Sequence, residues 1–476
     1  MTERRSRQFQ EANPRSYYAK HIAKAPLTSA EMKAFVGLRI IMEYFCIKRK
    51  YRDYWVSSGE HFISETPGVA DVFERDRFLA IWSFLHSMDE EDPTVNKADP
   101  LYKNRALMDK LIVAFKRYYV PSEYLSLDEG MIPAKNRLGI KQYIKNKPVK
   151  WGLKSFLLCD SENGYVFHFE VYTGKEVHVI PHLKATGNVV YRLLTDAGLH
   201  DKGYVLVMDR FYTSVTLANF LHQVCGTHAL GTTMTNKRFF PKQLIKGKKG
   251  FPQRGDFEFK CWYDITCYAW QDKNTVYLID TKFSPSEVTT CERTMKDGSS
   301  VVVPTPKAMS MYNQHMGGCD NNDQMTRLNR ARRHYKWPRR LFVKNVMWAI
   351  YNSYVINCKL TGKKPTFMNY LHDLCYAMIG SFRSLHSRKR RLSADSDRRL
   401  QNVGLHFPAI GEDGYNHRCI VCTKKESDFK RSNPGVENPY KRQKTNAKCT
   451  ECDAFLCLKK GSTCWQDWHL KKEYWR

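Results

Sequence analysis

Three short acidic segments stand out in this chain, because each places a carboxylate where an apolar run ends. They are Ser126–Glu129, Val207–Arg210 and Gly317–Asp320. The remainder is strongly basic, with 77 Lys and Arg against 48 Asp and Glu and a formal net charge of +29. A basic chain that presents a few fixed carboxylates is suited to hold divalent metal ions against the phosphodiesters of a polyanion. The pattern therefore favours DNA cutting and joining over DNA binding alone.

Metal-assisted phosphodiester chemistry uses two Mg²⁺ ions about 3.5–4 Å apart, one for the attacking oxygen and one for the leaving oxygen. Mg²⁺ prefers oxygen ligands, usually one or two carboxylates together with phosphate and water. Asp128 within a strand, Asp209 after a buried strand and Asp320 at a helix start could meet at one end of a sheet. A lone Asp at a strand end is more often a helix cap or a turn former. The competing carboxylates are Glu129, Asp160 and Asp323.

Six of the fifteen cysteines lie between Cys419 and Cys464. Two CxxC pairs in this segment indicate zinc, because each pair spans one edge of a tetrahedral site. A segment this short and charged could not fold on its apolar core alone. Seven ligands do not complete two four-coordinate sites, so an eighth is required, and His406 and His417 are the candidates. The seven are Cys419, Cys422, Cys449, Cys452, Cys457, Cys464 and His469.

Length and composition bound the class of protein. A chain of 476 residues is expected to form two to four domains, and its 42% hydrophobic and 13% aromatic content predicts a globular protein. Its longest uncharged apolar stretch, Asn345–Cys358, is too short for a membrane span of about 20 residues. Without an export signal, the cysteines are expected to be reduced, and Cys159, Cys225 and Cys319 are interpreted as core or loop thiols. The basic balance makes nucleic acid the expected partner.

The elements that must position these residues begin with three predicted helices before residue 122. They are Leu27–Tyr44, Asp71–His86 and Leu107–Tyr119. Thr28 and Glu31 have the spacing of a capping box, which places the start of the first helix at Leu27 or Thr28. The aromatic stripes of these helices are interpreted as ordinary helical core.

Residues 122–232 alternate between strands and helices, which is typical of an α/β layered fold. Tyr124–Met131, Gly152–Cys159 and Tyr165–Tyr172 are predicted strands, and the last two form an antiparallel hairpin. Gly203–Met208 is a continuous apolar run, which indicates a buried parallel strand. The predicted helices are Gly187–Ala197 and Val215–Val224, the second capped by Thr213 or Ser214.

From Thr233 to about Pro304 the chain is rich in turns and β-type segments, which predicts an inserted β module. A strong amphipathic helix is predicted from Trp337-Pro338 to a stop at Thr361-Gly362. Arg388–Arg391, among Ser and Asp residues, marks a flexible basic linker. This run and Lys441–Lys444 could also act as a nuclear signal or contact phosphates.

Several segments match one known family in the same order along the chain. On these motifs the chain resembles the piggyBac family of transposases over nearly its whole length. Independent matches in the right order are more specific than any single triplet. The matching segments are Leu127-Asp128-Glu129, Lys147–Lys154, Met208–Ser214, Tyr312–Met325 and Lys336-Trp337-Pro338, with Arg77-Phe78 and Leu85-His86.

The resemblance implies an α/β fold with a ribonuclease-H-like catalytic core and a β-rich insertion. A helical dimerisation and DNA-binding domain and a small C-terminal zinc-binding cysteine-rich domain would flank this core. The resemblance places a DDD triad on Asp128, Asp209 and Asp320, with Asp323 as an auxiliary carboxylate and two catalytic Mg²⁺ ions. It favours His406 as the eighth ligand of two structural Zn²⁺ ions. The expected domains are 1–122 and 331–383 (helical), 123–232 and 305–330 (core), 233–304 (insertion), 384–404 (linker) and 405–476 (zinc module).

Members of this family cut the terminal repeats of their own element and reinsert at TTAA targets, through a 3′ nick, a hairpin on the transposon end and strand transfer. The resemblance therefore predicts a nuclear, homodimeric DNA transposase that binds double-stranded DNA. Many members carry a long acidic leader, and this sequence departs from that pattern because its first helix is expected at Leu27 or Thr28. A domesticated, non-catalytic DNA-binding protein is the alternative. For the zinc module, the alternative is a RING- or PHD-like interaction domain.

Overall fold

The computed structural model describes residues 2–475 apart from 14, 24, 46–47, 49, 57–65, 90–91, 135–137, 146, 175–177, 248–249, 295–297, 329–335, 383–399, 401–405 and 412–414. The chain divides into two compact units, Met1–Thr66 with Arg75–Phe382 and Pro67–Glu74 with Arg383–Arg476. The predicted basic run Arg388–Arg391 lies outside the described residues. Among the residues described, no helix combines the length and apolar character that crossing a bilayer requires.

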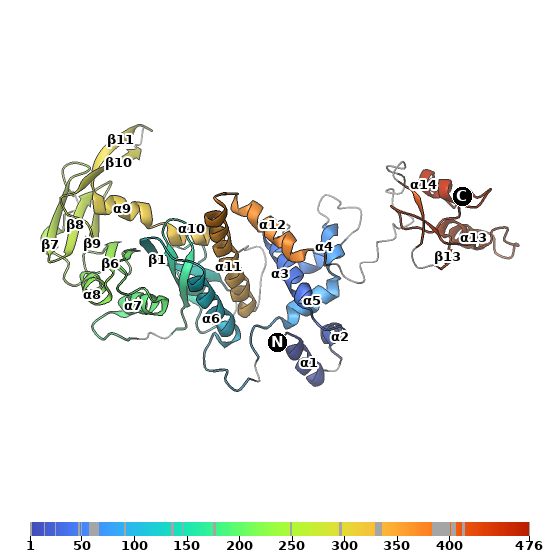
Figure 1. Ribbon diagram of the computed structural model, residues 1–476, viewed down its shortest axis with the longest axis horizontal. Coiled ribbons are helices and arrows are strands. Elements are labelled where there is room, and N and C mark those ends of the chain that lie inside the picture. Colours follow the sequence, from blue (N-terminus) through green and yellow to red (C-terminus); the bar gives the residue numbers. More distant parts are fainter. Residues whose placement is uncertain are drawn as a thin grey trace. The chain divides into compact units, whose positions relative to one another are not determined.

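The N-terminal part is helical, as predicted (Figure 1). The Thr28 Oγ1 accepts the Glu31 N–H at 3.1 Å, which caps helix α3 at the predicted place. The Glu31 carboxylate forms an ion pair with Arg77 of helix α5, whose Nε lies 2.7 Å from Glu31 Oε1. The elements are α1 (Thr2–Ala12), α2 (Tyr17–Ala23), α3 (Ser29–Tyr44), η1 (Tyr51–Trp55), α4 (Pro67–Val72), α5 (Arg75–Phe84) and α6 (Tyr102–Arg117).

Three features of this region differ from the sequence prediction, the first being that α6 begins at Tyr102 and ends at Arg117, whereas the sequence predicts Leu107–Tyr119. A single helix over Asp71–His86 is wrong, since α4 ends at Val72 and α5 begins at Arg75. Asp76 lies in the first turn of α5, where a negative charge stabilises a helix start. Helices α1 and α2 precede the expected first helix. Since α1 consists largely of polar helix formers, no apolar periodicity in the sequence indicates it.

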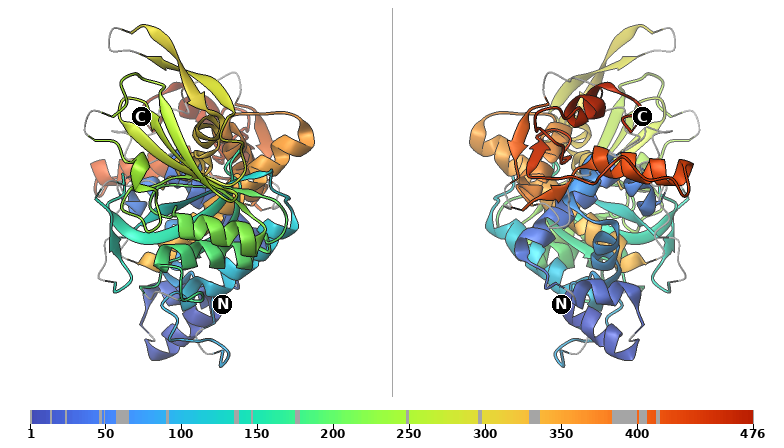
Figure 2. Two further views of the ribbon diagram at one scale, coloured as in Figure 1. Left: turned by 90° about the vertical axis from the view of Figure 1, so that its left-hand side faces the viewer. Right: turned by 90° about the vertical axis from the view of Figure 1, so that its right-hand side faces the viewer.

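The first unit is built around a nine-stranded mixed sheet in the order β2-β3-β1-β5-β6-β9-β8-β7, with β4 paired to β3. The predicted antiparallel hairpin is confirmed as β3–β4, and the predicted parallel strand is confirmed as β5, which pairs in parallel with β1 and β6. Figure 2 shows helices α7 and α8, in green, beside this sheet. The strands of this half are β1 (Tyr124–Pro133), β2 (Gln142–Tyr143), β3 (Trp151–Asp160), β4 (Val166–Val171), β5 (Val205–Met208) and β6 (His228–Thr232).

In the described part of the segment predicted as a β-rich insertion, the chain forms strands β7 to β11 and a short 3₁₀ turn, η3 (Lys242–Leu244). Strand β9 pairs antiparallel with β6, so β7 to β9 continue the core sheet. Tyr268 and Trp270 of β8 pack in one buried cluster with Val205 and Val207 of β5, so both halves share a core. Strands β10 and β11 form a separate two-stranded ribbon. The strands are β7 (Phe257–Trp262), β8 (Ile265–Gln271), β9 (Thr275–Asp280), β10 (Val288–Thr294) and β11 (Ser300–Pro306).

Helices flank the sheet and connect it to the N-terminal part. Ser214 caps α8 by accepting the Leu217 N–H at 3.2 Å, which settles the predicted cap on Ser214. Helix α10 packs against β1 and β3, α11 against α6, and α12 against α3. As predicted, α11 has Pro338 in its first turn and ends at a left-handed Gly362. These helices are α7 (Ala185–Ala197), α8 (Val215–Cys225), α9 (Lys307–His315), α10 (Gly318–Met325), α11 (Trp337–Thr361) and α12 (Phe367–Ile379).

The C-terminal part consists of short elements around a small core. Strand β12 pairs with β15, and β13 pairs with β14. The buried cluster at its centre contains Val421, Leu456 and Trp468, but most of its other members are cysteines. So small an apolar core needs a further source of folding free energy. The elements are β12 (Pro408–Ile410), β13 (His417–Arg418), α13 (Ile420–Ser432), β14 (Lys444–Thr445), β15 (Ala447–Cys449) and α14 (Cys464–Leu470).

Candidate active site and metal centres

Asp128 and Asp209 come from adjacent parallel strands. Leu127 on β1 stands opposite Met208 on β5, so the next residue along each strand is one of the two aspartates. Adjacent strands lie about 4.8 Å apart. The two aspartates therefore stand at the same level on neighbouring strands, where they can serve as two ligands of one cation site.

Asp128 is a buried carboxylate, only 8% exposed. Its Oδ1 accepts the Glu129 N–H at 2.7 Å, and its Oδ2 lies 3.2 Å from the Lys147 Nζ. Burial raises the pKa of Asp128 to about 7, with the Lys147 ammonium opposing the shift and the negative charges of Glu129 and Asp209 adding to it. Burial also raises the pKa of Asp209, and Glu129 adds to that shift. Carboxylates that disfavour each other's charge are stabilised by a cation placed between them.

Helix α10 brings the third acidic segment onto β1. The Cys319 N–H donates to Ser126 Oγ at 3.0 Å, which fixes the start of the helix against the strand. Gly318 is required there, because a Cβ at this position would lie 2.5 Å from Ser126 Oγ. Gly130 on β1 is also closely approached, because a Cβ there would lie 3.0 Å from Ser155 Oγ and 3.1 Å from an Asp323 carboxylate oxygen, which would have to shift slightly. This close packing places Asp323 directly over β1.

The two aspartates of α10 have different surroundings. Asp320 is exposed, whereas Asp323 accepts from the Lys344 Nζ at 3.1 Å. The Lys344 side chain is only 5% exposed and also donates to Thr326 Oγ1 at 2.7 Å, so Asp323 is the counter-ion of a buried cation. Both aspartates and Lys147 line a cavity of about 220 Å³.

The donor set fits Mg²⁺ in its chemistry, since fixed elements offer carboxylate oxygens, among them that of the buried Asp128, whose negative charge Glu129 and Asp209 disfavour. The four aspartates are nevertheless less tightly grouped than the cysteine ligands. Among the described residues, groups of three or more His, Cys, Asp or Glu with all ligand atoms within 4.8 Å occur only in the C-terminal part. Asp128 forms an ion pair with Lys147, and Asp323 forms one with Lys344.

The structure shows the hydrogen-bond partners of two competing carboxylates, Asp160 and Glu129. Asp160 is fully buried and accepts from the Tyr119 hydroxyl at 2.8 Å and the Ser122 N–H at 2.7 Å. It therefore anchors the chain that enters β1. Glu129 accepts from the buried Tyr212 hydroxyl at 3.1 Å, next to the acidic site.

Two lysines near the acids carry no sequence signal of their own in so basic a chain. Lys147 pairs with Asp128, and Lys154 on β3 lies 4.8 Å and 4.7 Å from the ring centres of Phe156 and Phe211. Burial lowers the pKa of Lys154, and the carboxylates of Glu129 and Asp128 oppose that shift. The only available clue to either lysine is its place in the segment Lys147–Lys154, which matched the family motifs.

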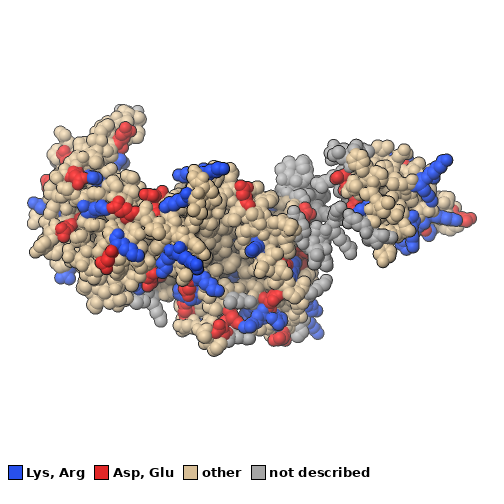
Figure 3. All heavy atoms as spheres, in the orientation of Figure 1, with Lys and Arg blue, Asp and Glu red and all other residues tan. Residues whose placement is uncertain are grey.

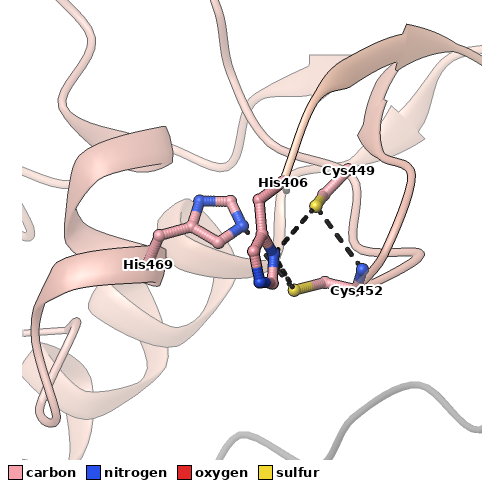
Figure 4. Close-up of side chains that lie close together, drawn as sticks. All are labelled: His406, Cys449, Cys452 and His469. Carbon is pink, nitrogen blue, oxygen red and sulfur yellow. Dashed lines mark hydrogen bonds between the residues drawn. The ribbon is translucent and has the colours of Figure 1, made fainter. Parts of the chain in front are cut away.

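The eight sequence-predicted zinc ligands come together as two sets of four. The first set combines a ligand before β12, a CxxC pair that begins at the last residue of β15 and a ligand on α14 (Figure 4). The Nδ1 of His406 lies 3.4 Å from Cys449 Sγ and 3.1 Å from Cys452 Sγ, and the Nε2 of His469 lies 3.6 Å from Cys452 Sγ. The first set is His406, Cys449, Cys452 and His469.

The second set contains four sulfurs: Cys419, Cys422, Cys457 and Cys464. Cys422 Sγ lies 3.9 Å from Cys457 Sγ and 3.5 Å from Cys464 Sγ. A Zn–S bond of about 2.3 Å in a tetrahedral site requires sulfurs about 3.8 Å apart, so the spacing fits zinc. Burial raises the pKa of Cys457 to about 12, so its thiolate needs a cation beside it.

The rival eighth ligand, His417, lies outside both sets. Its ring stacks on Phe455 with centres 4.1 Å apart. Along the chain the ligands of the two sets alternate in pairs, with His406 and His469 at the two ends. Each set therefore takes ligands from both halves of the segment. Neither site can form from one half alone, and the two sites must form together.

The comparisons with known proteins agree with these features. A family model described as Transposase IS4 matches residues 7–354. Human PiggyBac transposable element-derived protein 3 is 24% identical over 446 residues, which cover 91% of this chain and 69% of that protein. Human PiggyBac transposable element-derived protein 2 is 26% identical over 414 residues, which cover 83% of this chain and 66% of that protein. The chain thus spans about two thirds of each relative's length.

A solved structure has the same fold. The cryo-EM structure of a piggyBac transposase synaptic complex with hairpin DNA aligns with a TM-score of 0.65 and 23% identity, over 95% of this chain and 91% of that one. The family model covers well over half of the sequence, and the relatives and the fold are of piggyBac type. The chain belongs to the Transposase IS4 family, as a member of its piggyBac branch.

Proposed function

We propose that this protein is a DNA transposase of piggyBac type, which cuts transposon ends and joins them to TTAA target sites. The observation that carries the proposal is the placement of Asp128 and Asp209 at one level of adjacent parallel strands, with α10 packed against the same strand. Catalytic Mg²⁺ would be held by Asp128, Asp209 and Asp320, with Asp323 as the auxiliary carboxylate. When bound there, the metal supplies Lewis acidity toward the attacking and leaving oxygens.

The fold interpretation that accompanies this proposal is a ribonuclease-H-like core. Its support is the sheet order β4-β3-β1-β5-β6, in which an antiparallel hairpin adjoins three parallel strands. The residues of the chain have distinct tasks in this arrangement. The strands fix Asp128 and Asp209, Gly130 and Gly318 allow the close approach of α10, and Lys344 holds Asp323 in place.

Double-stranded DNA is the proposed partner, with two copies of the chain acting together in the nucleus. The net charge of +29 favours a polyanion, and the structural neighbour is described as a synaptic complex with hairpin DNA. In the C-terminal unit, Lys and Arg side chains gather around α13 (Figure 3), where Lys430, Arg431 and Arg442 are exposed. We assign two structural Zn²⁺ ions to this unit and recognition of the transposon end to its surface. This basic surface favours DNA over the RING- or PHD-like alternative.

The decisive experiment replaces single aspartates by Asn, which keeps the side-chain shape and removes the charge that anchors Mg²⁺. In a nicking and strand-transfer assay on DNA that carries the flanking terminal repeats, Asp128→Asn, Asp209→Asn and Asp320→Asn should abolish both reactions. DNA affinity should stay within a few-fold, and Asp323→Asn should be milder. Asp373→Asn on α12, whose side chain is 84% exposed, is the matched control and should react normally.

Two outcomes would contradict the proposal. Near wild-type cleavage by Asp128→Asn or Asp209→Asn would refute the metal assignment. A wild-type protein that binds the terminal repeats but never cuts them would support the alternative, a domesticated DNA-binding protein. The names of the relatives, which are described as transposable element-derived proteins, support testing for a domesticated DNA-binding protein.

A further inference from the structure

Lys147 enters the acidic site from the segment between β2 and β3. Its Nζ lies 3.2 Å from Asp128 Oδ2, and its side chain is 24% exposed. The ammonium is therefore held at the same carboxylate oxygen that Asp128 would offer to a metal ion.

The same lysine faces a cavity of mixed charge. The cavity of about 220 Å³ is lined by Lys147, Lys344 and the exposed Arg327, together with Asp320 and Asp323. Cations that converge on one hollow beside a nuclease-type site are suited to a backbone phosphate.

Lys344 and Lys147 are held differently. Lys344 is 5% exposed and is fixed by both Asp323 and Thr326. Among the residues described, Lys147 has a single hydrogen-bond partner, the Asp128 carboxylate. Lys147 can therefore exchange that partner for another anion in the cavity, whereas the position of Lys344 is determined by buried contacts.

We propose that Lys147 is a positioning residue that holds Asp128 in the free protein and transfers to a backbone phosphate when DNA enters. It thereby couples DNA binding to metal binding at Asp128. This inference rests on the proposed function, because it takes Asp128 to be a metal ligand. It goes beyond the proposed function because it assigns a role to Lys147, which is not one of the four aspartates, before and after DNA binds.

The direction of the coupling follows from competition for one oxygen. In the free protein the ammonium and a divalent ion compete for Asp128 Oδ2, so removing the ammonium strengthens metal binding. In the DNA complex the ammonium has moved to phosphate, so the wild-type protein binds metal more tightly with DNA than without it. Because coupling is reciprocal, the metal strengthens DNA binding by the same factor. A residue with only a structural role would weaken metal binding when removed.

The test measures Mn²⁺ affinity by electron paramagnetic resonance, with the full-length protein alone and with a duplex of its flanking terminal-repeat DNA. Lys147→Met keeps the aliphatic stem and removes the charge, Lys147→Arg keeps the charge, and Lys145→Ala on the same segment is an exposed control. We expect Lys147→Met alone to bind Mn²⁺ at least about fivefold more tightly than wild type and to lose most of the gain caused by DNA. Lys147→Arg should restore the coupling, and Lys145→Ala should match wild type.

Each outcome is informative. Unchanged or weaker Mn²⁺ binding by Lys147→Met, with circular dichroism like that of wild type, overturns the inference. If Lys147→Met lowers folded content, the Lys147→Arg and wild-type titrations still decide, since equal Mn²⁺ affinity of wild type with and without DNA also overturns it. Asp128→Asn distinguishes failure of the proposed metal site from failure of the role of Lys147. If it removes Mn²⁺ binding while Lys147→Met behaves like wild type, the proposed metal site stands and only the role of Lys147 fails. If Asp128→Asn leaves Mn²⁺ binding intact, the metal site itself fails.

Discussion

The side chain of Asn352 on α11 closes the outer edge of the core sheet at β4. Its Oδ1 accepts the Val166 N–H at 2.9 Å, and its Nδ2 donates to the Val166 carbonyl at 2.8 Å. Strand β4 pairs with β3 on its other side, so this amide takes the place of a further strand. Asn352 is 2% exposed and Val166 is 0% exposed, so water cannot substitute for the amide. We therefore predict that Asn352→Ala strongly destabilises this edge.

The magnitude follows from the two backbone groups that Asn352→Ala would leave unpaired. Each buried unsatisfied group costs about 1–3 kcal/mol, so the variant should lose about 2–6 kcal/mol. The chain offers a matched control two turns earlier on the same helix. Asn345 is 0% exposed, and neither polar atom of its side chain has a hydrogen-bond partner among the described residues. Asn345→Ala removes equal volume without breaking a hydrogen bond, so it should stay within about 1 kcal/mol of wild type.

Hydrogen exchange read by mass spectrometry is the appropriate assay, because a protein of several domains has no single unfolding free energy. The peptide that covers β4 reports local opening of the sheet edge. Since 1.4 kcal/mol corresponds to a factor of ten, Asn352→Ala should accelerate exchange in this peptide by about 30-fold or more. Equal protection of β4 in the Asn352→Ala and Asn345→Ala proteins would refute the reasoning.

Two further predictions concern pH and zinc. Burial lowers the pKa of His168 on β4 to about 4, so the folded state favours the neutral ring. This contribution, about 3 kcal/mol, is present above pH 6.5 and is lost as the pH falls from 6.5 toward 4. Thermal unfolding of His168→Gln should therefore depend less on pH in that window, and an unchanged profile would contradict the assignment. Elemental analysis of the full chain should find two zinc ions. Cys452→Ser should lower that content and impair terminal-repeat binding while exchange in β4 stays normal, whereas Cys267→Ser, a buried thiol outside both ligand sets, should keep both ions.

The sequence by itself determined the elements whose cause is local. The alternation in Tyr165–Tyr172 and the continuous apolar run before Asp209 predicted an antiparallel and a parallel strand, because side-chain periodicity records burial on one face or both. Thr28 and Pro338 marked helix starts, since capping needs only neighbouring residues.

Local signals also have limits, and these explain the prediction errors. The apolar residues between Asp71 and His86 fit one helix, but the structure has two helices here, because α4 ends at Val72 and α5 begins at Arg75. Helix α1 escaped detection because its residues are polar helix formers without an apolar stripe. Periodicity indicates a helix only where one face of that helix is buried against a core.

Only the tertiary structure decided which long-range neighbours each group acquired. Asp160 and Asp128 look alike in sequence, yet Asp160 binds Tyr119 and Ser122 while Asp128 lies beside Asp209. The division of the cysteines into two sets, the exclusion of His417 and the pairing of Lys147 with Asp128 depend in the same way on distant segments. Spacing along the chain identifies residues that can carry out the chemistry. Packing of strands and helices far apart in sequence decides which of them meet, because contact energies act through space.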